Sequence, residues 1–276
     1  MQTDSPPLYE GDGYAIAWKP PLMHSAPLVA GDPSLLTRYA MSFPEVLMVR
    51  GRKPVEGGLL HRLDYETRGL IVLAHRQKAF DELTLFQEEG RFVKEYRALC
   101  LDLRSFSKSV CMEGYPPRPE QEPVSSMRIE SAFRPWGEGR RAVRPVSLAM
   151  LPSNARRRKE LSFDRGGPYT TEILEITPLE RTSSLMMGAQ SVNIPLVMVR
   201  ARLCRGFRHQ IRAHLAWLLL PLLGDPLYAP KGLTLQSLLS DRAPFFLEAC
   251  ALEFPGVQGV SGTRQYRYES PLVFSV

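Results

Sequence analysis

A histidine, an arginine and an aspartate stand close together in the sequence GLLHRLDYETRG of residues 58–69. The apolar run of residues 70–74 follows them directly, and such a run is typical of a strand buried on both faces. His61, Arg62 and Asp64 should therefore lie in a loop at one end of a sheet, where a loop can present side chains to a cleft. A carboxylate there can hold a proton or stabilise positive charge on a substrate. The spacing alone fits a surface loop with an Arg–Asp ion pair better.

Other residues that could do chemistry give weaker signals. The sequence has no GxxxxGK[ST] phosphate loop, no HExxH zinc motif and no GxSxG nucleophile turn, which disfavours nucleotide hydrolysis, zinc proteolysis and serine hydrolysis. His209 and His214 are five positions apart, a poor spacing for two ligands on one helical face, so we expect no metal. The four cysteines form no Cys-x-x-Cys pair, which favours the reducing cytoplasm as the location.

The excess positive charge of the chain lies in one segment. The 276 residues are 44% hydrophobic and 23% charged, which is a globular composition with enough length for a large core. The net charge is +6, and residues 104–170 alone hold 13 Lys and Arg against 7 Asp and Glu. This segment also contains 8 of the 24 prolines, which predicts loops and short strands over a surface. Such a basic surface favours a polyanionic partner, and no apolar stretch or basic leader predicts a membrane partner.

The regions on both sides of that segment predict the elements that position these residues. We expect strands over residues 14–18, 70–74, 92–101, 171–177, 196–203, 245–254 and 266–274, and helices over residues 35–43, 79–89 and 211–219. Gly90 should cap the second helix and Pro221 should end the third. Many strands, three helices and no regular βαβ alternation predict an α+β fold with a largely antiparallel sheet. We expect a single domain over residues 1–276, with residues 104–170 as a basic, proline-rich insertion.

Residues 61–70, HRLDYETRGL, closely resemble the HRLDxxTSGL motif of the RluA-type pseudouridine synthases. Further family motifs lie around it in the expected order. Residues 10–20 (EGDGYAIAWKP) are similar to the family's opening acidic turn, strand and Lys-Pro, and residues 93–96 (VKEY) are similar to its KxY strand. Residues 209–215 (HQIRAHL) and 224–228 (GDPLY) resemble its HQIRxHL and GDxxY elements. Ordered matches over residues 10–228 are a specific signal, whereas any one alone would be weak.

The resemblance implies an isomerase that converts specific uridines of structured RNA, ribosomal or transfer, to pseudouridine without a metal or other cofactor. It implies that Asp64 acts at ribose C1′ and that Arg212 keeps this carboxylate ionised. Tyr96 would stack on the uracil, and Arg62 would fill the gap left by the extruded nucleotide or grip its phosphate. From the residues alone, Tyr96 could be a core aromatic, Arg62 a structural ion pair and Arg212 a solvated helix residue.

The resemblance also gives the basic segment a purpose, because contacts along the RNA backbone can offset the cost of extruding a base. The candidate phosphate contacts are Arg140, Arg141, Arg144, Arg156, Arg157, Arg158 and Lys159, with Trp136 or Tyr115 as stacking surfaces. The implied fold is that of the pseudouridine synthases, a mixed and mostly antiparallel sheet with flanking helices and a central catalytic cleft. We expect no separate N-terminal RNA-binding domain and no obligate protein partner.

The sequence departs from the family motifs at three places, and two other functions are alternatives to this interpretation. Arg68 stands where the family usually has Ser, Pro21-Leu22 replaces a small residue and Gly, and residues 205–208 (RGFR) replace Thr-Gly-Arg-Ser/Thr. An RNA-binding protein without catalysis is one alternative, although it would not need a carboxylate that faces a polyanion. An N-glycoside hydrolase acting on nucleosides is another, because the same aspartate could serve it. Release of free uracil would identify the hydrolase.

Overall fold

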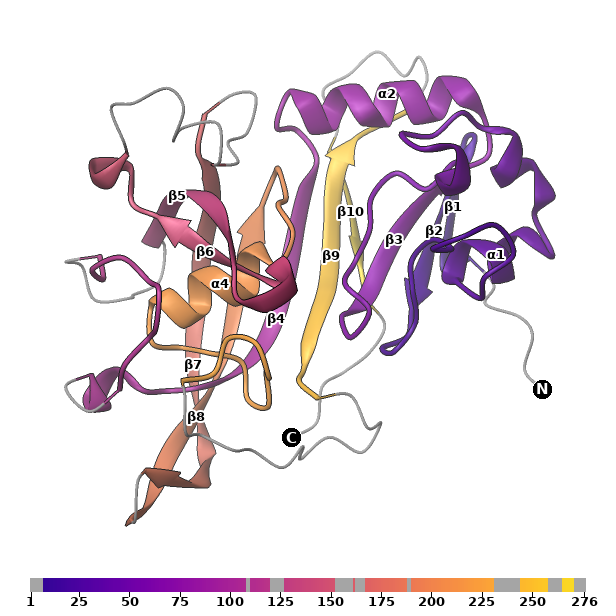
Figure 1. Ribbon diagram of the computed structural model, residues 1–276. Coiled ribbons are helices and arrows are strands. Elements are labelled where there is room, and N and C mark those ends of the chain that lie inside the picture. Colours follow the sequence, from indigo (N-terminus) through magenta and orange to yellow (C-terminus); the bar gives the residue numbers. More distant parts are fainter. Residues whose placement is uncertain are drawn as a thin grey trace. The chain divides into compact units, whose positions relative to one another are not determined.

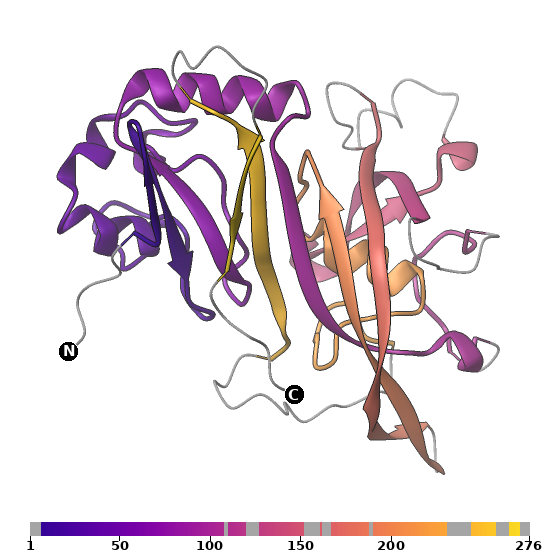
Figure 2. The ribbon, with the colours of Figure 1, turned by 180° about the vertical axis from the view of Figure 1, so that it is seen from behind.

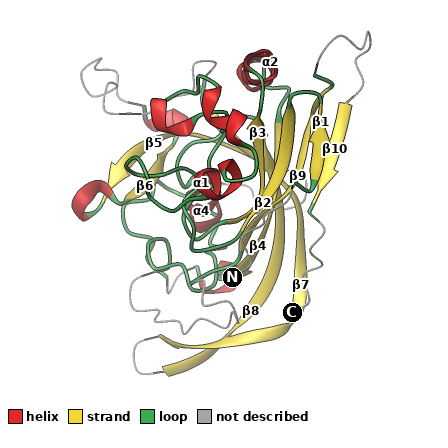
Figure 3. Cartoon of the chain, turned by 90° about the vertical axis from the view of Figure 1, so that its right-hand side faces the viewer, coloured by secondary structure: helices red, strands yellow, loops and turns green. Residues whose placement is uncertain are grey.

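The computed structural model describes residues 7–107, 110–119, 127–151, 161, 167–187, 190–230, 244–257 and 265–270. The chain forms two compact units, one of Met1–Glu95 with Glu248–Val276 and the other of Tyr96–Leu247, where the sequence predicted a single domain. Strands make up most of the regular structure of the described residues, as Figure 3 shows. Most strand pairs are antiparallel, and the first unit also contains a parallel pair. The α+β prediction is confirmed.

Four strands of the first unit are, in spatial order, β1 (Tyr9–Gly11), β2 (Tyr14–Lys19), β3 (Arg68–Ala74) and β9 (Leu247–Pro255). A fifth, β10 (Gln265–Glu269), lies outside this order and pairs with β9. β3 runs parallel to β9, whereas the other neighbours are antiparallel. Gly69 makes the parallel contact possible, because a Cβ at this position would lie 2.4 Å from the carbonyl oxygen of Ala249. The glycine of the HRLD motif is therefore needed for packing of the strand that follows Asp64.

The helix α2 (Gln77–Glu88) covers the apolar surface of β3 with Ala79, Phe80 and Leu83, which belong to the same core cluster as β3. In Figures 1 and 2 it lies across one end of the strands of this unit. The predicted stop at Gly90 is confirmed. The N–H groups of Gly90 and Arg91 donate to the carbonyl groups of Gln87 and Phe86, which is the Schellman arrangement.

The helix α1 (Leu35–Ala40) is shorter than the predicted one, and Ser34 caps its start. The Ser34 hydroxyl accepts a hydrogen bond from the Thr37 N–H, and the Thr37 hydroxyl accepts one from the Ser34 N–H. This reciprocal pair satisfies two donors at the helix start. Single-turn 3-10 helices complete the described chain: η1 (Pro44–Met48), η2 (Pro54–Glu56), η3 (Arg104–Phe106), η4 (Glu138–Arg140) and η5 (Leu148–Met150).

The second unit contains the antiparallel strands β8 (Gln190–Leu203), β7 (Tyr169–Met187), β5 (Met127–Trp136) and β6 (Ala142–Val146), in this spatial order. β4 (Val93–Leu101) begins in the first unit and continues into the second. β7 and β8 are much longer than predicted and extend together as the twisted ribbon seen in Figure 2. The basic insertion thus supplies two of the short strands that its composition predicted, and one of them, β5, pairs with β7 in the sheet.

The helix α4 (Gln210–Trp217) is the core element of the second unit, and all eight of its residues are buried. Ala213 and Ala216 pack in one cluster with Phe133, Ala142, Val143 and Tyr228. β5 and β6 contribute three of these residues, so the insertion is part of the core that surrounds α4. Among the described residues, no helix combines the length and apolar character that crossing a membrane requires.

Candidate active site

Asp64 lies half-buried in the loop before β3, and the backbone on both sides of it is fixed. The Ser25 hydroxyl donates to the Leu63 carbonyl at 2.9 Å and accepts from the Leu63 N–H at 3.0 Å. The Met23 N–H donates to the Tyr65 carbonyl at 3.2 Å. The carbonyl of Asp64 itself accepts from the Thr67 N–H at 3.1 Å, which forms the turn into β3. The residues before and after the carboxylate are therefore held by main-chain bonds.

Lys19, at the end of β2, is buried and further stabilises the backbone of the Asp64 loop. Its side chain is 0% exposed, and its ammonium group donates to the carbonyl groups of Pro20, Met23 and Tyr65 at 2.9, 2.7 and 3.2 Å. Burial lowers the pKa of Lys19 to about 7, and the nearby charges of Asp64 and Glu66 oppose this shift. Three carbonyl acceptors match the three protons of a charged ammonium. Lys19 thus joins two loops and puts a positive charge near the Asp64 carboxylate.

Sequence reasoning assigned no role to Lys19 or Ser25, although Lys19 is the lysine of the opening Lys-Pro motif. Ser25 gave no signal at all, because a serine in a loop is common and its partner is 38 positions away. Both residues act on the backbone of the Asp64 loop. Sequence reasoning missed these two contributions to the loop that carries Asp64.

His61 and Arg62 point to different surroundings. His61 is buried, and its Nε2 accepts from the Val72 N–H at 3.4 Å. Burial, with the charges of Lys94 and Arg52, holds the pKa of His61 well below its usual value, so the ring is neutral. Arg62 is 59% exposed and donates to the buried Glu56 at 3.2 Å. The ion pair that the sequence left open as an alternative is present, and a role of Arg62 in holding RNA stays a prediction.

In the second unit, the position of the Arg212 guanidinium group is fixed by contacts of the side chain itself. It is 1% exposed, and its Nε and Nη2 donate to the two carboxylate oxygens of Asp225 at 2.7 and 2.8 Å. The guanidinium group also lies over the rings of Tyr228 and Phe245, 5.0 and 4.6 Å from their centres. The alternative of a solvated helix residue is wrong. The predicted pairing of Arg212 with Asp64 joins residues of the two units and stays a prediction.

Tyr228 connects Arg212 with the basic insertion. Its hydroxyl accepts from the Val143 N–H of β6 at 3.0 Å and lies 3.0 Å from His209 Nδ1. Burial raises the pKa of Tyr228 to about 12, so the hydroxyl stays protonated. Sequence reasoning assigned no role to Asp225 or Tyr228, although both belong to the GDPLY motif. The fold shows their use, because they hold and cover the Arg212 guanidinium.

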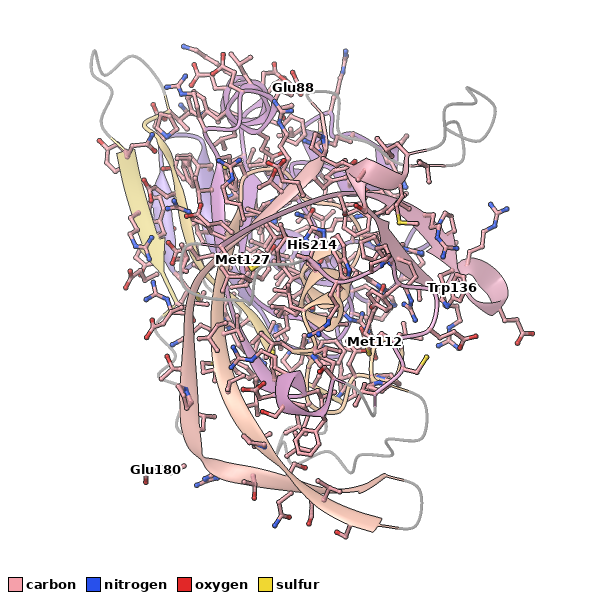
Figure 4. The ribbon with its side chains drawn as sticks, turned by 90° about the vertical axis from the view of Figure 1, so that its left-hand side faces the viewer. Glu88, Met112, Met127, Trp136, Glu180 and His214 are labelled. Carbon is pink, nitrogen blue, oxygen red and sulfur yellow. The ribbon has the colours of Figure 1, made fainter. Side chains whose placement is uncertain are left out.

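The two histidines near α4 serve hydrogen bonds. His214 bonds through Nε2 to the Ser131 hydroxyl at 2.9 Å and through Nδ1 to the Thr171 hydroxyl at 2.8 Å. Burial lowers the pKa of His214 to about 3, so the ring is neutral. Figure 4 shows His214 in the interior, away from the exposed η4 turn near Trp136. Across the described ranges, no group of three His, Cys, Asp or Glu side chains is placed to hold a metal ion.

The remaining predicted residues are placed as follows. Tyr96 lies on β4 and is 9% exposed, and its stacking on a base stays a prediction. Arg140 and Arg141 are exposed at the η4 turn.

The prediction for Arg144 requires a correction. Arg144 is 7% exposed, its Nε donates to the Glu113 carbonyl, and aromatic rings surround it. It is therefore a core residue rather than a phosphate contact. The rings are those of Tyr115, Trp136 and Tyr228. Arg156, Arg157, Arg158 and Lys159 lie outside the described residues.

Comparison with known protein families shows to which family the chain belongs. The family described as RNA pseudouridylate synthase matches residues 13–217, which is most of the chain and includes parts of both units. The chain belongs to the RNA pseudouridylate synthase family. The matched range contains Lys19, Asp64, Tyr96 and Arg212, whereas Asp225 and Tyr228 lie just beyond it.

Known members of the family are similar to this chain over much of its length. It is 26% identical to the "Uncharacterized RNA pseudouridine synthase" of Chloroflexus aurantiacus over 213 residues, which cover 76% of this chain and 49% of the relative. It is 28% identical to "RNA pseudouridine synthase 1" of Oryza sativa subsp. japonica over 183 residues, covering 62% and 49%. This chain thus matches about half the length of each relative.

Two solved human structures show the same fold. The structure of RNA pseudouridylate synthase domain containing 4 has a TM-score of 0.60 at 16% identity and covers 97% of this chain and 88% of its own. That of RNA pseudouridylate synthase domain containing 1 has a TM-score of 0.54 at 19% identity, covering 95% and 81%. The predicted pseudouridine synthase fold is confirmed.

Proposed function

We propose that this protein is an RNA pseudouridine synthase, an isomerase that converts uridines of structured RNA to pseudouridine with Asp64 acting at ribose C1′. Within the family, one observation supports the assignment of Asp64 as the catalytic residue. The backbone on both sides of Asp64 is held by Ser25, Met23 and Lys19, while the Asp64 side chain lies only half-buried. A residue that must reach a substrate atom needs this combination of fixed position and access.

The chemistry is an internal rearrangement. The bond between C1′ of the ribose and N1 of the uracil breaks, and a bond between C1′ and C5 forms. The C5 proton leaves and N1 gains a proton, so the atoms balance without a co-substrate. The Asp64 carboxylate would stabilise or trap the positive charge that develops at C1′ when the first bond breaks. Tyr96 would hold the detached uracil by stacking while it turns.

The chemistry supplies its own assay. RNA carrying tritium at C5 of its uridines releases the label to water only when the isomerisation is complete. We expect the wild-type protein to release tritium, Asp64→Asn to release none above background, and the matched control Glu66→Gln to retain activity. Glu66 lies in the same loop and is also half-buried, so its substitution removes the same charge. An active Asp64→Asn protein would overturn the catalytic assignment.

The same samples separate the competing functions. Free uracil in the products would indicate an N-glycoside hydrolase. RNA binding without tritium release would indicate a binding protein. A ribosomal or transfer RNA substrate, met in the cytoplasm, is part of the proposal. Mapping pseudouridine in cells without the gene, complemented by wild type or Asp64→Asn, tests it, since the substrate site should return only with the wild type.

A further inference from the structure

Two residues of the loop before α4 hold the basic insertion in place. The ring of Phe207 stacks on Phe133 of β5, with 5.0 Å between ring centres and 9° between planes. The Arg208 guanidinium donates to the carbonyl groups of Arg140 and Ala142 at 2.7 and 3.3 Å. Phe207 and Arg208 are also positions at which the chain departs from the usual Thr-Gly-Arg-Ser/Thr. These departures are thus among the contacts that hold the insertion beside α4.

Arg208 also fixes an unusual turn. Arg140 has a φ of +54°, a conformation that costs a residue with a Cβ on the order of 1 kcal/mol. The hydrogen bond from Arg208 to the Arg140 carbonyl helps to stabilise it. In this conformation the Arg140 and Arg141 side chains are both exposed, as is Arg208 itself. The turn therefore gathers three positive side chains at the surface.

These three arginines differ in their partners from three other exposed arginines of the unit. Arg128, Arg200 and Arg202 each pair with a glutamate, at 3.4, 3.3 and 3.0 Å. By contrast, Arg140, Arg141 and Arg208 form no ion pair with any residue in the described part of the chain. Glu138 is the one acidic side chain of residues 137–141. Gathered like charges without carboxylate partners are unfavourable in the free protein and favourable when a polyanion binds.

We propose that Arg140, Arg141 and Arg208, here termed the arginine rim, bind backbone phosphates of the RNA substrate. The inference rests on the proposed function for the identity of the polyanion. Arg208 lies four positions before Arg212, at the start of the helix that carries it. RNA held by the arginine rim would thus be anchored to the element that positions Arg212, through residues in which this chain departs from its family.

The salt dependence of RNA binding tests the arginine rim without requiring catalysis. Each phosphate neutralised by a protein cation contributes about 0.7 to 0.9 to the slope of log affinity against log salt concentration. A fluorescent RNA hairpin with uridines in its loop is titrated with Asp64→Asn protein, which cannot alter the RNA. Adding Arg140→Gln and Arg141→Gln should flatten the slope by about 1.5, and adding Arg208→Gln should flatten it further. Because Arg208 also holds the turn, the double variant separates charge from folding.

A matched control removes three charges elsewhere on the same unit. Arg128→Gln, Arg200→Gln and Arg202→Gln together should leave the slope nearly unchanged, because these arginines are already paired. A hairpin with neutral methylphosphonate linkages in place of its phosphates should bind the wild type and the rim variants equally. An equal flattening by both triple variants, or none by the rim variants, would overturn the proposal. If rim variants lose RNA while the wild type releases no tritium, the rim stands and the proposed isomerase activity fails.

Discussion

Asp64 in the first unit and Arg212 in the second are fixed in opposite ways. The backbone around Asp64 is clamped by Ser25 and Lys19, and the carboxylate-bearing side chain stays half-exposed. Arg212 is buried, with its guanidinium paired to Asp225 and covered by two rings. A group that acts on a substrate has to remain accessible, so its position is set through the main chain. A charged group that only organises a site can instead be buried and held by hydrogen bonds of its side chain. The protein then loses much stability if the partner of that charge is removed.

The largest effect should come from breaking the buried pair. Arg212→Met leaves the Asp225 carboxylate buried without its guanidinium, which should cost about 3–5 kcal/mol of unfolding free energy in urea denaturation. The control Arg202→Met breaks an exposed pair with Glu172 and should cost less than about 1 kcal/mol. Arg212→Met with Asp225→Leu should recover most of the loss. A single variant as stable as the control would show that the pair contributes little.

A second large effect should appear in the pH dependence of stability. The pKa of His214 is about 3 in the folded protein and about 6.5 when unfolded, because burial disfavours its charged form. Below pH 6.5 the unfolded chain binds a proton that the folded chain does not. Stability therefore falls as the pH falls towards 3, by up to about 1.4 kcal/mol per pH unit from this group.

His214→Gln keeps a side chain that can bond Ser131 and Thr171 but removes this titration. Between pH 6.5 and 4.5 the wild type should lose about 2–3 kcal/mol more than the variant. Urea denaturation at both pH values measures the difference. Parallel losses in the two proteins would contradict a neutral, buried His214.

The sequence predicted the local elements well and the contacts between distant segments poorly. The three helices, the strand after Asp64 and the Gly90 stop follow from periodicity and caps, which need only neighbouring residues. The length of β7 and β8 did not, since the outer part of β7 (PLERTSS, residues 178–184) is mostly polar and contains a proline, and Pro195 interrupts the pattern of β8. The burial of Arg144 was also missed, because the rings around it come from three separate segments and charge counting cannot detect them.

A moderate effect should follow from loosening the clamp beside Asp64. Ser25→Ala removes both hydrogen bonds to the Leu63 main chain and leaves a buried N–H and C=O without them, which should cost about 2 kcal/mol of stability. Because small displacements of a reacting group reduce catalysis strongly, kcat for tritium release should fall by about tenfold or more while KM changes little. Ser34→Ala, which removes a helix cap in the same unit, should cost about 1 kcal/mol and leave kcat unchanged. A loss of kcat in both variants would assign the effect to general destabilisation.

The smallest effect on stability should come from Arg62, which lies two positions before Asp64. It is held neither by a backbone clamp like that of Asp64 nor by a buried side-chain pair like that of Arg212. Its pair with Glu56 is open to water on the arginine side, so Arg62→Gln should cost less than about 1 kcal/mol. If Arg62 also grips the RNA, the variant should raise KM for tritium release and reduce the salt slope of RNA binding by about 1. Glu56→Gln provides the control, since it breaks the same pair and leaves the arginine free to bind RNA. A variant with unchanged KM and salt slope would make Arg62 a structural residue and leave Asp64 as the reactive group of its loop.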